Sequence, residues 1–125
     1  MEKINDQKII LNSAPERALR YNSGKPPMHF IPLDMLQGLA RVLEDGAVKY
    51  LKDNWRKGAP ASEQIDSLLR HLCKLQSGEM CDQESGLPHV DHMLFNVISL
   101  RLALEIEGKI QKDPGQGNRV KELNK

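Results

Sequence analysis

Residues 44–66 read EDGAVKYLKDNWRKGAPASEQID and contain the end of one predicted helix, a polar connection and the start of the next helix. Acidic side chains lie at both ends of this stretch, and Lys, Trp and Arg side chains lie between them. Carboxylates bind hard cations, Lys and Arg bind phosphate, and an indole ring can stack on a base. The stretch therefore predicts a phosphate-handling site built on two helices.

Apolar residues recur at steps of three and four residues on both sides of this stretch, as they do in amphipathic helices. The spacing predicts helices over residues 32–53, 62–78 and 88–108, with Ser62 as the N-cap of the second. Gly46 lies inside the first helix and marks either a break or a close approach to the backbone, and we favour the close approach. The third helix is apolar on more than one side, so we expect it to be buried in the core and at a subunit interface.

The composition of the 125-residue chain fits one globular domain, with 39% hydrophobic and 28% charged residues. Two Phe, two Tyr and one Trp leave the core to Leu, Ile, Val, Met and Ala, which favours an all-α fold. We expect an N-terminal arm over residues 1–20, a folded domain over residues 21–108 and a flexible tail over residues 109–125. A net charge of +1 argues against stable binding to nucleic acid.

The N-terminal residues mix charged side chains with isolated apolar ones, and no window of the sequence approaches a membrane-spanning length. The two cysteines, Cys73 and Cys81, do not form a disulfide framework. We therefore expect a cytoplasmic protein with no membrane partner.

Three carboxylates are candidates for a metal site. Glu63 and Asp66 are three residues apart and share one helical face, where both can bind Mg²⁺. Glu44 of the preceding helix can join them if the two helices pack antiparallel. The alternative is that Glu63 and Asp66 only stabilise a helix N-terminus and that Glu44 is a solvated surface residue.

Basic residues next to these acids are candidates for phosphate binding, with Lys49 and Arg56 the foremost. Trp55 can stack on a base, although a single Trp in a small helical protein is more often a core or interface residue. The Ser23-Gly24-Lys25 loop resembles a fragment of a phosphate loop but is not a Walker motif.

The histidines allow further interpretations. Cys73, Cys81, His89 and His92 can form a zinc site of a structural interaction module, although the cysteines lack the short spacing of a zinc knuckle. A histidine-aspartate metal hydrolase is a weaker alternative, because most of its ligand pattern is missing. Arg70 and His71 either bind phosphate or tie the second helix to the acidic loop through Glu79, Asp82 or Glu84.

Several separate strings together resemble the phage dATP/dGTP diphosphohydrolase family of MazZ type. They are YNSGKPP from Tyr21, GAVKY from Gly46, DNWRKG from Asp53, RHL from Arg70 and ESGLPHVDH from Glu84. The resemblance covers roughly residues 20–105. It implies similarity to the MazG-like nucleoside triphosphate pyrophosphohydrolases, whose all-α bundles are completed by oligomerisation into dimers or tetramers.

The resemblance implies a metal site for Mg²⁺, or for Mn²⁺, held by an ExxE and an ExxD motif. The second motif corresponds to Glu63 and Asp66, and the first to Arg41 and Glu44, so that Arg41 replaces an acid. Either one carboxylate fewer binds the metal, or Asp45 or an acid on the third helix such as Asp91 compensates for the missing acid.

The implied reaction is hydrolysis of a purine dNTP between the α and β phosphates, with Glu44 or Glu63 as the base. The resemblance implies that Lys25, Lys49 and Arg56 hold the phosphates and that Asn96 or Trp55 contacts the sugar or base. Ser23, Gly24, Arg70 and His71 are the further candidate nucleotide-binding residues. The resemblance makes dGTP the leading substrate and dATP the second, and it links the product to phage synthesis of 2-aminoadenine.

Overall fold

A computed structural model describes residues 18–19 and 24–115 of the chain. The chain divides into two units, of which the larger is Ile31–Pro114. The described part of the smaller unit contains a short 3₁₀ helix, η1 (Met28–Phe30), in which the rings of His29 and Phe30 meet edge to face at 4.8 Å. Most of the predicted arm over residues 1–20 lies outside the described residues.

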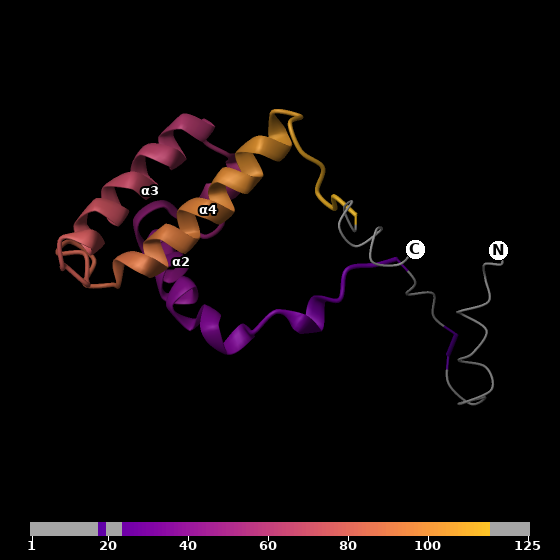
Figure 1. Ribbon diagram of the computed structural model, residues 1–125, viewed down its shortest axis with the longest axis horizontal. Helices are drawn as coiled ribbons and strands as arrows, with labels where there is room; N and C mark the ends of the chain where they lie inside the picture. The colour runs from indigo at the N-terminus through magenta and orange to yellow at the C-terminus, as the bar shows by residue number, and fades with distance from the viewer. Residues whose placement is uncertain (1–17, 20–23, 116–125) are drawn as a thin grey trace. The chain divides into compact units, whose positions relative to one another are not determined.

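The larger unit is built on three α-helices, which are α2 (Gln37–Tyr50), α3 (Ala61–Gln76) and α4 (His89–Ile106). Helices α3 and α4 lie side by side and run in opposite directions, and α2 packs against α4 (Figure 1). The described residues contain no strand, only an isolated bridge between Cys81 and Pro88. The prediction of an all-α fold is therefore confirmed for the part of the chain that the structure describes.

The helix ends differ from the predicted ones in two places. The first predicted helix opens with a 3₁₀ turn, η2 (Leu33–Leu36), and the α-helix begins only at Gln37. The second helix has Pro60 rather than Ser62 as its N-cap, so the predicted cap was wrong. Gly78 follows α3 with a φ of 103°, a left-handed conformation that ends a helix readily.

The connection from α2 to α3 contains two residues with positive φ that are not glycine. Leu51 has a φ of 87° and Asp53 a φ of 63°, both unusual for residues other than glycine. A short 3₁₀ helix, η3 (Asn54–Lys57), follows and packs against α4. The connection therefore places the ring of Trp55 against Phe95 of α4.

The buried face of α4 is formed by small or polar residues, namely His89, Asn96, Ser99 and Ala103. These residues recur at steps of three, four and seven, so they lie along one side of the helix. Small side chains allow neighbouring helices to approach closely. The leucines of α4 are half-buried. Helix α3 has no fully buried residue within the described chain.

Residues beyond the third helix extend the compact unit. The guanidinium of Arg101 donates hydrogen bonds to the carbonyl oxygens of Gln111 and Lys112, at 2.6 and 2.9 Å. The compact unit therefore continues past residue 108 to Pro114. None of the helices among the described residues has the length and apolar character that a membrane-spanning segment needs.

Candidate functional site

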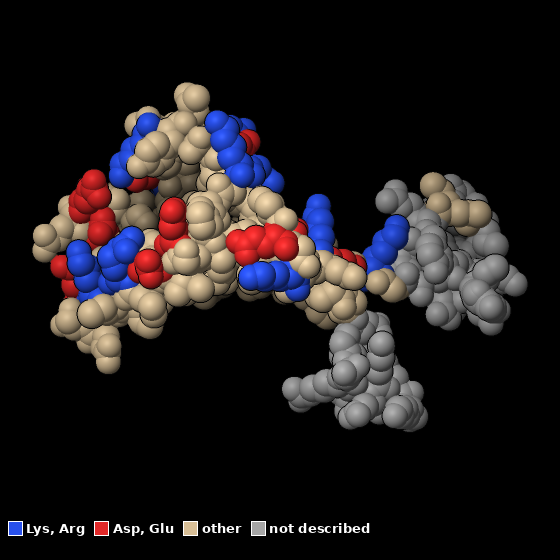
Figure 2. Space-filling view, turned by 90° about the horizontal axis from the view of Figure 1, so that it is seen from above, with Lys and Arg blue, Asp and Glu red and all other residues tan. Residues whose placement is uncertain are grey.

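Two adjoining cavities of about 490 and 240 Å³ lie between α2, η3, α3 and α4. They share one wall, to which Lys49, Ser67, Arg70, His71, Glu84 and His92 contribute. Over the face of the molecule in Figure 2, basic and acidic side chains are interspersed, and they do not separate into patches of one sign. The lining of the cavities likewise contains side chains of both signs.

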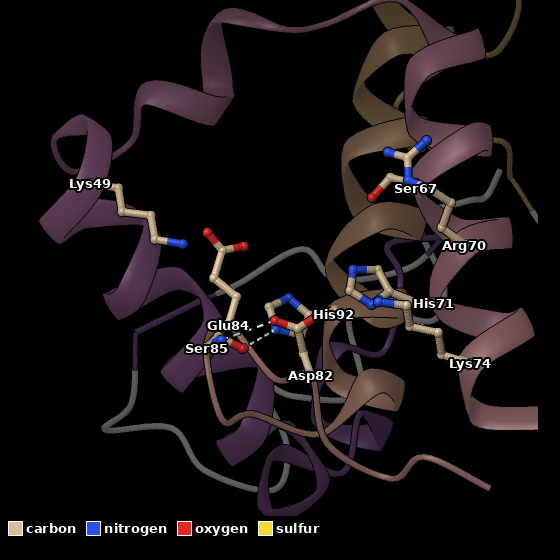
Figure 3. Close-up of a pocket in the computed structure, with 9 residues that line it drawn as sticks. All are labelled: Lys49, Ser67, Arg70, His71, Lys74, Asp82, Glu84, Ser85 and His92. Carbon is tan, nitrogen blue, oxygen red and sulfur yellow. Dashed lines mark hydrogen bonds between the residues drawn. The ribbon is translucent and has the colours of Figure 1, made fainter. Parts of the chain in front are cut away.

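The smaller cavity is lined by three cations. Lys49 comes from the end of α2, whereas Arg70 and Lys74 are one turn apart on α3 (Figure 3). Asp45, 3.4 Å away, and then Glu84 raise the pKa of Lys49, so its ammonium stays protonated. Side chains of this kind bind phosphate oxygens.

The larger cavity has an aromatic wall formed by Trp55 and Phe95. Their ring centroids are 5.8 Å apart in an edge-to-face arrangement, and Tyr50 lines the same cavity. The guanidinium of Arg56 lies over Trp55 at 4.9 Å and 3.7 Å from Asp53, so Arg56 supports the indole ring and does not line the cavity. The face of either ring offers an apolar surface on which a base can stack.

A chain of hydrogen bonds runs behind the smaller cavity. Oε2 of Glu79 lies 2.7 Å from Nε2 of His89, and Nδ1 of His89 lies 2.8 Å from Nδ1 of His71. Because an ionised carboxylate only accepts hydrogen bonds, His89 donates from Nε2; in the neutral form of His89, Nδ1 then accepts from His71. Burial, reinforced by the His92 and His89 rings, holds the pKa of His71 below its ordinary value, so this ring is neutral at pH 7.

The loop between α3 and α4 supplies the acidic side of the smaller cavity. Asp82 accepts a hydrogen bond of 2.9 Å from the backbone N–H of Ser85, which lowers the pKa of Asp82. The hydroxyl of Ser85 also lies 2.8 Å from Nε2 of His92, whose ring stacks on His71 at 4.7 Å. The carboxylate of Glu84 points into the cavity toward Lys49 (Figure 3).

Asn96 lines the larger cavity and carries an unsatisfied acceptor. Its side-chain amide donates to Oε1 of Gln64 at 3.3 Å and to Oγ of Ser67 at 3.1 Å. Its Oδ1 atom is buried and has no hydrogen-bond partner among the described residues. A buried acceptor without a partner costs about 1–3 kcal/mol.

The predicted carboxylates do not come together in the described chain. Glu44 is exposed and pairs with Arg41 at 3.0 Å, while Glu63 and Asp66 are exposed on α3. The expected pairing of the two helices fails because α2 packs against α4. None of these acids lines either cavity.

Asp91, the fourth predicted metal ligand, lies against Gly38 of α2. A Cβ atom at Gly38 would collide with the Asp91 carboxyl group, whereas a Cβ at Gly46 would meet nothing within 4 Å. The close approach expected at Gly46 therefore occurs at Gly38, and Gly46 lines the larger cavity.

The predicted Cys2His2 zinc site is not formed. Cys73 and Cys81 are both exposed and free. Among residues 18–19 and 24–115, the only group of three or more His, Cys, Asp or Glu side chains with ligand atoms within 4.8 Å is His71, Asp82 and His89. The candidate ligands near His89 are therefore His71 and Asp82, and not the two cysteines expected from sequence.

The remaining predicted residues divide into two sets. The cavity walls include Lys49, Trp55, Arg70, His71 and Asn96. Ser23 lies outside the described residues, and Gly24 and Lys25 belong to the smaller unit, so their role in phosphate binding stays a prediction.

Sequence reasoning assigned no nucleotide-binding role to Ser67, Lys74, Glu84, Ser85 and Phe95, all of which line a cavity. Glu84 and Ser85 begin the ESGLPHVDH string, which is part of the family resemblance and could have indicated their role.

Comparisons with known proteins identify the family of the chain. A family described as dATP/dGTP diphosphohydrolase, N-terminal, matches residues 15–113. A protein of Salmonella phage PMBT28 named dATP/dGTP diphosphohydrolase is 32% identical over 74 residues, which are 59% of this chain and 25% of the relative. The chain thus covers a quarter of the length of that relative.

No solved structure matches the chain significantly. The family match spans most of the sequence and includes all three α-helices of the larger unit. The chain therefore belongs to the family described as dATP/dGTP diphosphohydrolase, N-terminal.

Proposed function

We propose that this chain forms the nucleotide site of an enzyme that hydrolyses purine deoxynucleoside triphosphates to the monophosphate and pyrophosphate. The observation that carries the proposal is the combination of Lys49, Arg70 and Lys74 with the aromatic wall of Trp55 and Phe95 in adjoining cavities. The cations can bind a triphosphate, and a purine can stack on one of the aromatic rings. The family match and the name of the phage relative support the same substrate class.

In the proposed complex, the purine lies in the larger cavity and the phosphates lie in the smaller one. The larger cavity, at about 490 Å³, falls within the range of small-molecule sites. Arg70 lines both cavities, so it can hold the α phosphate at their junction. Lys49 and Lys74 then hold the β and γ phosphates.

The reaction needs a group that takes a proton from water. We assign this role to Glu84, because its carboxylate points into the cavity, whereas the predicted bases Glu44 and Glu63 line neither cavity. The water oxygen bonds to the α phosphorus while its proton passes to Glu84. The bond from the α phosphorus to the bridging oxygen breaks, and that oxygen leaves with pyrophosphate.

We also propose that the reaction depends on Mg²⁺ or Mn²⁺, which the family resemblance implies. Such an ion neutralises charge on the triphosphate when it is bound. The four predicted ligands, Glu44, Glu63, Asp66 and Asp91, do not fit one ion site in the described chain, so no step of the reaction is assigned to the ion.

We propose dGTP as the preferred substrate and dATP as the second. The family resemblance makes dGTP the leading substrate, and Asn96, which lines the larger cavity, can contact its sugar or base. The link to 2-aminoadenine synthesis rests on the family resemblance. We also expect the protein to lie in the host cytoplasm, where dNTPs are found, and not to bind nucleic acid stably.

The enzyme is expected to be a homo-oligomer, either a dimer or a tetramer. Ile65, Leu69 and Leu72 form an apolar stripe on α3 with 42%, 54% and 43% of each residue exposed. An apolar stripe of this size usually marks a contact surface. A second copy of the chain can cover it.

The Leu69→Lys variant tests the oligomer. A charge in the middle of a buried apolar contact is costly, so we expect the variant to be a monomer where the wild type is not. Light scattering coupled to size-exclusion chromatography measures the mass, and Glu63→Lys, on another face of α3, is the control. A wild-type monomer at micromolar concentration would contradict the proposal.

A panel of the four canonical dNTPs, with Mg²⁺, Mn²⁺ or EDTA, tests the activity. Chromatography of the products distinguishes the expected pyrophosphate from single phosphate. We expect Arg70→Gln to lower kcat/KM for dGTP by about 10- to 100-fold, because it removes a charge-assisted hydrogen bond worth about 1.5–3 kcal/mol.

Arg41→Gln is the matched control for Arg70→Gln, because Arg41 is an exposed arginine outside both cavities. Equal losses in the two variants would refute the assignment of the cavity. Release of phosphate alone, or preference for pyrimidine dNTPs, would refute the proposed reaction.

A further inference from the structure

Three side chains from different parts of the larger unit converge behind the smaller cavity. His71 comes from α3, Asp82 from the following loop and His89 from the first position of α4. One potential ligand atom from each lies within 4.8 Å of the other two. Residues 11 and 18 positions apart are therefore brought to one point by the fold.

The two imidazoles meet through atoms that compete for one proton. Nδ1 of His71 and Nδ1 of His89 are 2.8 Å apart, so only one of them can carry a proton between them. A metal ion can take the place of this proton if the rings move slightly apart, because neutral imidazole nitrogens are metal ligands.

A neighbouring carboxylate orients the buried ring. His89 is fully buried, and Glu79 accepts the hydrogen bond from its Nε2 at 2.7 Å. Metal-binding histidines usually donate their other N–H to a carboxylate or carbonyl, which fixes the tautomer and raises the basicity of the ligand nitrogen. The contact of His89 with Glu79 has this arrangement.

We propose that His71 Nδ1, His89 Nδ1 and the Asp82 carboxylate bind one divalent transition-metal ion, with Glu79 as the hydrogen-bond partner of His89. Two imidazole nitrogens and one carboxylate oxygen suit Zn²⁺, Co²⁺ or Ni²⁺ better than Mg²⁺, which prefers oxygen ligands. The site differs from the Cys2His2 site considered from sequence and shares only His89 with it. It does not depend on the proposed hydrolase activity.

One side of this site faces the smaller cavity. His71 and Asp82 line that cavity, whereas His89 lies behind them. Three protein ligands with a fourth position open to a cavity are typical of zinc sites that bind a water molecule or a substrate. An ion here would therefore be accessible to small molecules from the cavity.

Titration of the metal-free protein with Co²⁺ tests the proposal without nucleotide. We expect one Co²⁺ ion per chain, visible absorption bands of a site with fewer than six ligands, and no displacement by a large excess of Mg²⁺. His71→Asn and Asp82→Asn are expected to abolish this binding. Glu79→Gln is expected to weaken it by about 10- to 100-fold.

Two controls separate this site from other ligands. The Cys73→Ser/Cys81→Ser double variant and the His29→Asn variant remove exposed thiols and an exposed imidazole, and both are expected to bind Co²⁺ as the wild type does. Circular dichroism establishes that each variant is helical. Asp82→Asn changes only a loop side chain, so it remains informative if His71→Asn does not fold.

The proposal is overturned if the wild type binds no Co²⁺ at millimolar concentration, or if folded Asp82→Asn binds it as the wild type does. Loss of binding in the cysteine variant would equally overturn it. A failure of dNTP hydrolysis with intact Co²⁺ binding would instead refute only the proposed enzyme activity.

Discussion

Glu84→Gln is expected to lower kcat for dGTP hydrolysis by about 10²- to 10⁴-fold, the usual contribution of a general base. Glutamine keeps the size of the side chain and its hydrogen bonding but cannot accept the proton of the attacking water. Because the cations that hold the triphosphate remain, KM should change much less than kcat. Initial rates of pyrophosphate release over a range of dGTP concentrations measure both constants.

The same assay compares Glu84 with the bases expected from sequence. Glu44→Gln and Glu63→Gln remove the two carboxylates of the MazG-like pattern, both of which are exposed and outside the cavities. If either variant loses activity by two orders of magnitude while Glu84→Gln does not, the general base is Glu44 or Glu63 and not Glu84.

Gly38→Ala is expected to destabilise the protein by about 1–3 kcal/mol, the usual cost of overpacking. A Gly to Ala change inside a helix normally stabilises it, by up to about 1 kcal/mol. At Gly38 the new methyl group would collide with the Asp91 carboxyl group, so α2 and α4 would have to separate or Asp91 would have to rotate. The loss thus reports how closely α2 and α4 approach.

Gly46→Ala is the matched control, because it lies on the same helix with open space around it and should be neutral or stabilising. Urea denaturation gives the free energy of unfolding of each variant. In an Asp91→Ala background the cost of Gly38→Ala should largely disappear. Equal effects of the two glycine substitutions on the wild type would show that Asp91 does not press on α2.

The helices could be predicted from sequence because apolar periodicity is a local property. The three expected segments correspond to η2 with α2, to α3 and to α4. The errors lie at the ends, where Pro60 and not Ser62 precedes α3. Periodicity alone also gave no sign that small and polar residues such as Ser99 form the buried face of α4.

The sequence predicted the parts of the candidate site that depend on the chemical character of one residue, and not the parts that depend on how helices pack. Lys49, Arg70 and Trp55 could be predicted as nucleotide-binding residues because their charge or aromatic character can be read from the sequence. All three line the larger cavity. The proposed carboxylate cluster depended on how α2 and α3 pack, and residue spacing within one helix does not determine packing between two. The acids at Asp82 and Glu84 lie in a loop, which has no periodicity to reveal its role.

The loop between α3 and α4 is closed at its base by backbone hydrogen bonds. Asp82 N donates to Leu87 O and His89 N donates to Met80 O, both at 2.8 Å. Adding or removing a single residue between these bonds would shift Asp82 and Ser85 relative to the histidines on the two helices. The length of this loop therefore determines the geometry of the site. We expect relatives with a longer or shorter loop to have a different site geometry, even where the side chains are the same.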